Sequence, residues 1–212
     1  MRIFSRRLAL AAALTVGGLF VGLSAVAQTG PAVTADDMTL GNARAPVTIV
    51  EYGSAACTHC AAWARDVYPA FKAKYIDTGK VRYVFREAIT SPPQLAAAGF
   101  MLARCAGKNK YFSTLEQVFL AQEDVFRTGD IKAPLLAVAA KAGMTEPQFM
   151  ACVTDEKGVE ALNARVGKWE TTAKFQVTPT FDINGKRYEG GQTLAQLDAA
   201  IAAATKKKPH GD

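Results

Sequence analysis

The sequence predicts an α/β protein in which a single mixed β-sheet is interrupted by a helical insertion. Three observations predict this fold. A strand–helix–strand unit begins at residue 47, about 80 residues with helical periods follow, and two strands and a helix close the chain. A chain of 212 residues, of which 50% are hydrophobic, can bury a large core. This composition excludes a disordered, fibrous or multispanning membrane protein.

Residues 1–27 have the pattern of a secretory signal peptide. Met1 to Arg7 is basic, Leu8 to Val26 carries no charge, and Ala25-Val26-Ala27 forms a small-residue cleavage site. An uncleaved membrane anchor is the alternative, but the glycines in the uncharged stretch disfavour it. Such a leader indicates export to a bacterial periplasm, by the Sec or the twin-arginine route. Disulfides persist in that compartment.

The formal net charge of +6 comes partly from this leader. Arg2, Arg6 and Arg7 lie in it, and it contains no acidic residue. Of the 25 basic residues, 22 remain without these three arginines, and they only slightly outnumber the 19 acidic ones. The mature chain is therefore not expected to bind nucleic acid.

The first half of the sheet domain is predicted over residues 47–90. It follows an extended lead-in, 28–46, that is rich in Gly, Pro and Asp. Val47 to Tyr52 is a β-branched run typical of a strand, and Val81 to Phe85 is a second such run. Between them apolar residues recur at helical spacing from residue 57 to about 75, with a kink expected at Pro69. Short links of this kind indicate a right-handed βαβ unit.

Residues 91–174 are predicted to form the inserted helical domain. Apolar residues recur three and four apart around Leu95, around Leu115 and after Pro134. The clearest helix carries the stripe Val159, Leu162, Val166, Trp169 and Ala173.

The sheet domain resumes in residues 175–205. Asn184-Gly185 is a strong hairpin signal between two predicted strands, Thr180 to Ile183 and Lys186 to Glu189. Thr193-Leu-Ala-Gln196 is a capping box that should begin the last helix. Residues 206–212 form a polar tail.

The motif Cys57-Thr58-His59-Cys60 lies where the first strand is followed by the first helix. Residues three apart on a helical turn have Cα atoms about 5–5.5 Å apart, which suits a disulfide. Cys57 would occupy the helix N-terminus, where unpaired N–H groups and the helix dipole favour a thiolate. His59 could donate a hydrogen bond or charge to its sulfur. A stabilised thiolate favours the dithiol, so the disulfide should be an oxidant.

Two other roles are open to this cysteine pair. A purely structural disulfide that closes four residues contributes only about 2 kcal/mol through loop entropy. A zinc site needs about four ligands, whereas His59 and His210 are the only histidines. Redox chemistry, without a metal or a cofactor, is the favoured interpretation.

These residues resemble a known family. Val47 to Cys60, with Val177-Thr178-Pro179-Thr180-Phe181 and Asn184-Gly185 downstream, resembles the DsbA family of periplasmic thiol:disulfide oxidoreductases. The resemblance covers residues from about 38 to 204. It implies a thioredoxin-like mixed sheet with an inserted α-helical domain, in agreement with the order of elements above. DsbA is itself a reference example of a low-pKa cysteine, so the thiolate argument and the resemblance are not independent.

The resemblance implies roles for the residues around Pro179. Pro179 matches the cis-proline of thioredoxin folds, although an ordinary trans proline before a strand is the alternative. Thr178 matches the position that contacts the active sulfurs. Isomerase-type members often carry Thr there, and many oxidases carry Val. The dipeptide Thr58-His59 is oxidase-like instead, so the redox potential and direction stay open.

A buried acid is the third feature that the resemblance implies. Glu51 lies six residues before Cys57, where the family often places an acid. Its carboxylate could relay a proton to Cys60 during exchange. A solvated strand residue is the alternative, although a charge within an apolar strand usually has a reason.

Cys105 and Cys152 lie in the helical block, each on an apolar face. They could be two buried free thiols, which is a risky arrangement in an oxidising compartment. The pair is similar to a second disulfide found in some branches of the family, and a structural disulfide is predicted. It would close about 48 residues and contribute about 4 kcal/mol. A regulatory disulfide is the minor alternative.

The resemblance implies an enzyme that donates the Cys57–Cys60 disulfide to unfolded or partly folded secreted polypeptides in the periplasm. A membrane quinone-linked partner would then reoxidise it. A disulfide isomerase or reductase of the same fold is the alternative, and a non-catalytic chaperone-like module is a more distant one. Isomerases of this group usually carry an N-terminal oligomerisation segment. Only about 19 residues separate the predicted cleavage site from the first strand, so a monomer is expected.

Overall fold

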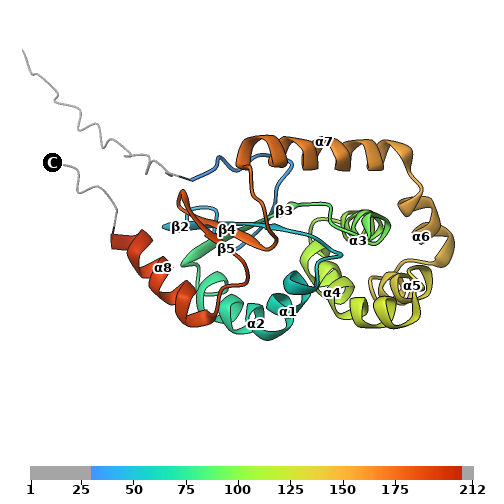
Figure 1. Cartoon of the computed structure of the whole chain (residues 1–212), viewed down its shortest axis with the longest axis horizontal. Coiled ribbons are helices and arrows are strands. Elements are labelled where there is room, and N and C mark those ends of the chain that lie inside the picture. Colours follow the sequence, from blue (N-terminus) through green and yellow to red (C-terminus); the bar gives the residue numbers. More distant parts are fainter. Residues whose placement is uncertain (1–29, 207–212) are drawn as a thin grey trace, which may run out of the picture.

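The computed structural model describes residues 30–206. A five-stranded sheet with the order β1-β3-β2-β4-β5 forms its centre (Figure 1). The pairing of β2 with β3 is parallel, and the other pairs are antiparallel. The strands are β1 (Met38–Leu40), β2 (Val47–Gly53), β3 (Val81–Glu87), β4 (Thr180–Ile183) and β5 (Lys186–Glu189). The predicted fold class, a mixed sheet of thioredoxin type with an inserted helical region, is confirmed.

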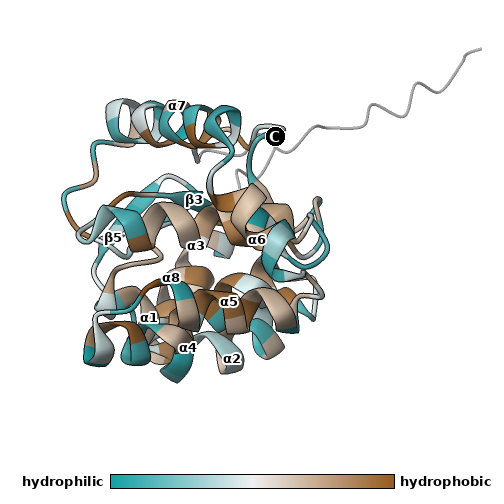
Figure 2. Cartoon of the chain, turned by 90° about the vertical axis from the view of Figure 1, so that its right-hand side faces the viewer, coloured by the Kyte–Doolittle hydropathy of each residue, from teal (hydrophilic) through white to brown (hydrophobic). Residues whose placement is uncertain are grey.

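The helices lie in three groups. One face of the sheet is crossed by α7 (Glu156–Ala173). The opposite face carries α1 (Thr58–Asp66), α2 (Tyr68–Phe71), the π-helical turn η1 (Lys72–Ile76) and α8 (Leu194–Lys206). Beyond one end of the sheet gather α3 (Pro93–Cys105), α4 (Tyr111–Thr128), α5 (Lys132–Lys141) and α6 (Glu146–Val153). Figure 2 shows α7 on the opposite side of β3 from α1 and α8.

Strand β2 is buried on both faces. Val47 and Ile49 belong to the larger core, which also contains residues of α1 and the inserted helices. Val50 and Tyr52 point the other way and pack with Trp169 of α7. Side chains alternate between the two faces of a strand, so Glu51 has the parity of Ile49 and is carried into the larger core.

The first helical region differs from its prediction. The sequence predicts one kinked helix from residue 57 to about 75, whereas α1 ends at Asp66 and two short segments follow. Pro69 has no N–H to donate to the carbonyl of Arg65, so the α-helical ladder cannot pass through it. The extended lead-in also contains a strand that was not predicted, β1, which pairs with β3. Three residues are too few for an alternating pattern to be visible.

The elements after α7 match their prediction. The bounds of β4 and β5 are those predicted, and Asn184 and Gly185 adopt φ values of 46° and 88°, as a two-residue hairpin turn of type I′ requires. The capping box forms, because the backbone N–H of Gln196 donates to Thr193 Oγ1 at 3.3 Å and the Thr193 N–H donates to Gln196 Oε1 at 2.8 Å.

The predicted signal peptide, 1–27, lies outside the described residues, as does the polar tail beyond Lys206. Between residues 30 and 206, no helix is both long enough and apolar enough to span a membrane.

Candidate active site

Cys57 is the N-cap residue of α1, as the sequence predicts. The backbone N–H of Cys60 donates to Cys57 Sγ across 3.4 Å, which satisfies one of the free donors at the helix start. Cys57 is partly exposed, whereas Cys60 is fully buried. Both are free thiols, so the structure is that of the reduced form. Only the sulfur of Cys57 can be reached by another molecule.

The two thiols differ strongly in acidity. Hydrogen bonding from the Cys60 thiol is the main factor that lowers the pKa of Cys57 to about 5, against the opposing effect of burial. Thr178 and the backbone N–H groups of Cys60 and His59 assist. Burial raises the pKa of Cys60 well above its usual range. His59 therefore acts on the sulfur through its main chain, while its side chain is exposed. The motif alone predicts a contribution from the imidazole ring instead.

We expect the reduced protein to show a thiolate titration with a midpoint near pH 5. Free cysteine titrates near 8.5, and hydrogen bonds to the Cys57 sulfur stabilise its charged form. The absorbance of the thiolate near 240 nm, followed from pH 3 to 9, measures the midpoint. A Cys60→Ala variant should titrate at a higher pH, because it lacks the main donor. A wild-type midpoint near 8.5 would contradict the proposed thiolate.

Thr178 and Pro179 join the site from the other end of the chain. The Thr178–Pro179 peptide bond is cis, and the carbonyl oxygen of Thr178 lies 3.3 Å from Cys57 Sγ. Pro179 directly precedes β4, which pairs with β2. The structure thus brings together the two motifs that are far apart in the sequence. The Ser91–Pro92 bond is also cis, which the sequence analysis did not predict.

Glu51 is a buried acid that interacts electrostatically with both cysteines, and the residue is 1% exposed. Burial raises its pKa to about 8, although the hydroxyl of Tyr83, which donates to Glu51 Oε2, opposes the rise. The charge of Glu51 in turn raises the pKa of Cys60. Burial next to a thiol excludes the solvated strand residue that was the alternative. A carboxyl group that titrates near neutral pH beside a buried thiol can exchange protons with it.

Three further residues complete the site. The sequence alone does not single them out. Tyr83 is in β3, opposite Ile49 in register, and alternation along β3 could have placed it beside Glu51. Gln122 of α4 donates from Nε2 to the carbonyls of Ala55 and Cys57, at 2.8 and 3.3 Å, and so attaches the inserted helices to the active-site loop. The N–H of Ser54 donates to Cys60 Sγ at 3.5 Å. No local pattern marks Ser54 or Gln122.

Comparisons with known proteins show to which family this chain belongs. A family model described as "Thioredoxin" matches residues 33–203. The crystal structure of Wolbachia pipientis alpha-DsbA1 superposes with a TM-score of 0.75 at 25% identity, covering 83% of this chain and 94% of that one. The chain belongs to the DsbA family of thioredoxin-fold proteins. BdbD from Bacillus subtilis has a TM-score of 0.69 at 20% identity, covering 80% of this chain and 93% of that one.

A rickettsial relative supports the same family. The Rickettsia bellii protein named "Putative protein-disulfide oxidoreductase" is 34% identical over 176 residues, which is 81% of this chain and 67% of that protein. The chain thus spans about two thirds of the length of the rickettsial relatives it matches.

The second cysteine pair of this DsbA-family chain forms a disulfide between α3 and α6. Cys152 is 7% exposed and packs in the core, whereas Cys105 is exposed. The expectation that both cysteines lie on packed faces is therefore wrong for Cys105. It is the last residue of α3, where the helix leaves the core.

Replacement of both Cys105 and Cys152 by Ala should lower the free energy of unfolding by about 2–4 kcal/mol. The bond spans 47 positions of sequence, and without it the unfolded chain gains loop entropy. Urea unfolding of the wild type and the double variant measures the loss. Thiol exchange of the folded variant at Cys57 should stay close to that of the wild type. An equally stable but inactive variant would contradict the structural role.

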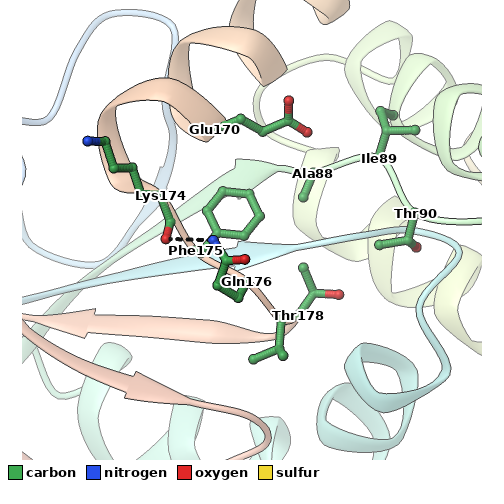
Figure 3. A pocket seen from close by; sticks show the side chains of 9 residues that line it. Ala88, Ile89, Thr90, Glu170, Lys174, Phe175, Gln176 and Thr178 are labelled. Atoms are coloured by element: carbon green, nitrogen blue, oxygen red, sulfur yellow. Dashed lines mark hydrogen bonds between the residues drawn. The ribbon is translucent and has the colours of Figure 1, made fainter.

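A hollow of about 500 Å³ opens beside Thr178. One wall is the loop Ala88, Ile89 and Thr90 after β3, and the other is the end of α7 with the segment that leads to β4 (Figure 3). That second wall combines Glu170 and Lys174 with Phe175, Gln176, Val177 and Thr178. The hollow can therefore accept a chain that carries both apolar and polar groups next to Cys57.

Proposed function

We propose that this chain is a dithiol oxidase that passes the Cys57–Cys60 disulfide to polypeptides folding in the periplasm. The family and the dithiol geometry support thiol:disulfide exchange at this pair. The observation that carries the oxidase direction is the low pKa of Cys57, about 5. A thiolate stabilised in the reduced protein has no counterpart in the disulfide, so the disulfide is the less stable form.

The reaction proceeds through a mixed disulfide. A substrate thiolate attacks Cys57 Sγ, forms a new S–S bond and expels Cys60 with the electron pair of the old bond. Cys60 takes up a proton, because burial strongly disfavours its thiolate. A second substrate thiolate then attacks the substrate sulfur and expels Cys57, which stays a thiolate. The substrate is oxidised by two electrons and the enzyme is reduced by two.

The substrates we propose are unfolded or partly folded secreted polypeptides. Their cysteines are accessible to the partly exposed Cys57, and the adjacent hollow can hold the residues that flank such a cysteine. The leader pattern of residues 1–27 supports export to the periplasm. A membrane quinone-linked partner would reoxidise Cys57 and Cys60, and the enzyme would act as a monomer without a cofactor.

A disulfide isomerase or reductase is the second candidate, and Thr178 favours it. In the family, this position before the cis-proline often carries Thr in isomerase-type members. The carbonyl oxygen of Thr178 lies 3.3 Å from Cys57 Sγ, so this residue is placed to influence the release of substrate from that sulfur.

Equilibration with glutathione buffers tests the direction. For an oxidase we expect a reduction potential nearer the value of about −120 mV for DsbA than the value of about −270 mV for thioredoxin. The fluorescence of Trp63, which is buried in α1 three residues after Cys60, provides the signal. The oxidase should also oxidise reduced ribonuclease faster than it rescues scrambled ribonuclease, with Cys57→Ala as the inactive control. A thioredoxin-like potential with rapid rescue would contradict the oxidase and favour the second candidate.

A further inference from the structure

The ends of β2 and β3 lie side by side next to the cysteine pair. The two strands are parallel, with Gly53 opposite Glu87, and the N–H of Ala88 then donates to the carbonyl of Gly53 at 2.8 Å. Parallel strands present their carboxyl ends at the same edge of a sheet, so the loops that follow them meet there. One of these loops leads to Cys57, and the other forms a wall of the hollow (Figure 3).

Ser54 is the residue at which the first of these loops contacts both cysteines. It is fully buried, and its backbone N–H donates to Cys60 Sγ at 3.5 Å. Its carbonyl accepts the N–H of Cys57 at 3.0 Å. Burial is the main cause that raises the pKa of the Cys60 thiol, whereas the N–H of Ser54 lowers that pKa. Ser54 therefore stabilises the negative form of the Cys60 sulfur.

The side chain of Ser54 is held by the second loop. Thr90 donates to Ser54 Oγ twice, from Oγ1 at 2.8 Å and from its backbone N–H at 3.3 Å. The N–H of Ala56 donates to the same oxygen at 3.3 Å. Hydrogen bonds that converge on one buried oxygen hold the side chain, and with it the attached backbone, in one orientation. Loss of the Thr90 hydroxyl would loosen the residue whose N–H contacts Cys60.

The Cys60 sulfur becomes negative when the disulfide is passed on. A substrate thiolate attacks Cys57 Sγ, the Cys57–Cys60 bond breaks, and Cys60 leaves with the electron pair of that bond. A thiol with a lower pKa leaves faster. Cys60 is fully buried, and in a site without water a preorganised N–H aimed at the atom where charge develops lowers the barrier strongly. The N–H of Ser54 has this position relative to Cys60.

We propose that Thr90 is a positioning residue for disulfide exchange, which holds Ser54 so that the Ser54 N–H stabilises Cys60 as it leaves. The inference rests on the proposed function, because Cys60 is expelled when the disulfide is donated. Burial keeps Cys60 protonated in the reduced protein at neutral pH. The N–H therefore faces an uncharged sulfur both before and after the reaction. Its alignment should change the rate far more than the reduction potential.

Reduction of the oxidised protein by dithiothreitol at pH 7 tests this inference. One thiolate of the reagent attacks Cys57 and expels Cys60, which takes a proton. The second thiolate of the reagent attacks the sulfur bound to Cys57 and expels Cys57. The reagent is oxidised by two electrons, and the cysteine pair is reduced by two. Stopped-flow fluorescence of the buried Trp63 follows the reaction. A small reagent is chosen because Thr90 also lines the hollow, where a peptide could contact it.

Thr90→Val removes the hydroxyl and nearly keeps the shape of the side chain. We expect its reduction to be slower by about five- to tenfold, because outright loss of such a donor costs about 10²–10³-fold and here the donor is only misplaced. Thr90→Ser keeps the hydroxyl and should react at close to the wild-type rate. Ser54→Ala should be as slow as Thr90→Val, and the double variant no slower than either. The glutathione equilibrium of each variant should match that of the wild type.

Two controls separate this role from a general distortion of the loops. Alkylation of Cys57 by iodoacetamide in the reduced protein does not expel Cys60, so Thr90→Val should be alkylated at the wild-type rate. Thr205→Val removes a hydroxyl that donates within α8, to the carbonyl of Ile201 at 2.8 Å. This variant should be reduced by dithiothreitol like the wild type.

A wild-type rate of reduction in Thr90→Val would overturn the inference, as would a Thr90→Ser variant that is equally slow. Equal slowing of reduction and alkylation would also overturn it. Ser54→Ala carries the same comparison if Thr90→Val does not fold. In each of these cases the proposed function would stand. A thioredoxin-like potential of the wild type would instead contradict the proposed oxidase, and the rate comparison would still decide the role of Thr90.

Discussion

Glu51→Gln should stabilise the reduced protein at pH 9 and slow its thiol exchange. The pKa of Glu51 is raised from 4.5 to about 8 in the folded protein. Below pH 4.5 the carboxyl group is protonated in both the folded and the unfolded states, so it has no effect on stability. Between pH 4.5 and 8 the unfolded chain ionises and the folded protein does not, which favours unfolding. Above pH 8 both states are ionised, so the loss in free energy of unfolding no longer grows. Each unit by which the pKa is raised corresponds to about 1.4 kcal/mol of that loss.

Gln removes this ionisation and keeps an oxygen that can accept the Tyr83 hydroxyl. We therefore expect Glu51→Gln to exceed the wild type in free energy of unfolding by about 3–5 kcal/mol at pH 9 and by much less at pH 4.5. Urea unfolding at both values measures this under mild reduction, with the Cys105–Cys152 bond verified by mass spectrometry. Glu160→Gln, which changes an exposed acid on α7, should behave like the wild type.

The same variant lacks the group that exchanges a proton with Cys60. Its thiol exchange should be slower by about 10² at pH 7, in the range for loss of a general acid–base. Equal stability of variant and wild type at pH 9 would show that Glu51 ionises freely in the fold. An unchanged exchange rate would show that Cys60 obtains its proton elsewhere.

Local signals account for the parts of the fold that the sequence predicts well. The β4–β5 hairpin depends on Asn184 and Gly185, two residues that readily adopt positive φ, and its bounds are those predicted. The helix α7 carries a long apolar stripe, and Leu162, Val166 and Trp169 of that stripe are buried. β1 is different, because its place in the sheet is set by β3, over forty positions away in sequence.

The residues of the candidate site also fall into two groups: those marked by a signal in the sequence and those placed by tertiary packing. Cys57 and Cys60 are recognisable from the spacing between them and from their position at the start of a helix. The segment around Pro179 is recognisable from the family resemblance. Tyr83 and Gln122 carry no motif. They reach the site because the sheet register places β3 beside Glu51 and because α4 packs against α1. Such relations depend on tertiary packing, which a single sequence does not display.

Glu87 connects the inserted helices to the sheet, and the loss of its charge should strongly destabilise the protein. It ends β3, its side chain is 1% exposed, and it pairs with two arginines from different helices. Arg104 of α3 donates from Nε to Oε1, and Arg165 of α7 donates from Nε to Oε2 at 2.8 Å. The side chains of Arg104 and Arg165 are only 22% and 13% exposed, so neither can be fully solvated if the carboxylate is removed.

We expect Glu87→Gln to lower the free energy of unfolding by about 3–5 kcal/mol, because it leaves two largely buried cations without an anion. Asp124→Asn is the matched control. Its partner Arg127 lies at 2.6 Å, but both side chains are more than half exposed, so that loss should be within about 1 kcal/mol. Urea unfolding of the oxidised proteins at pH 7 compares the two. Similar small losses for both variants would mean that water reaches Arg104 and Arg165 readily, and packing of α3 and α7 alone would then hold the insertion on the sheet.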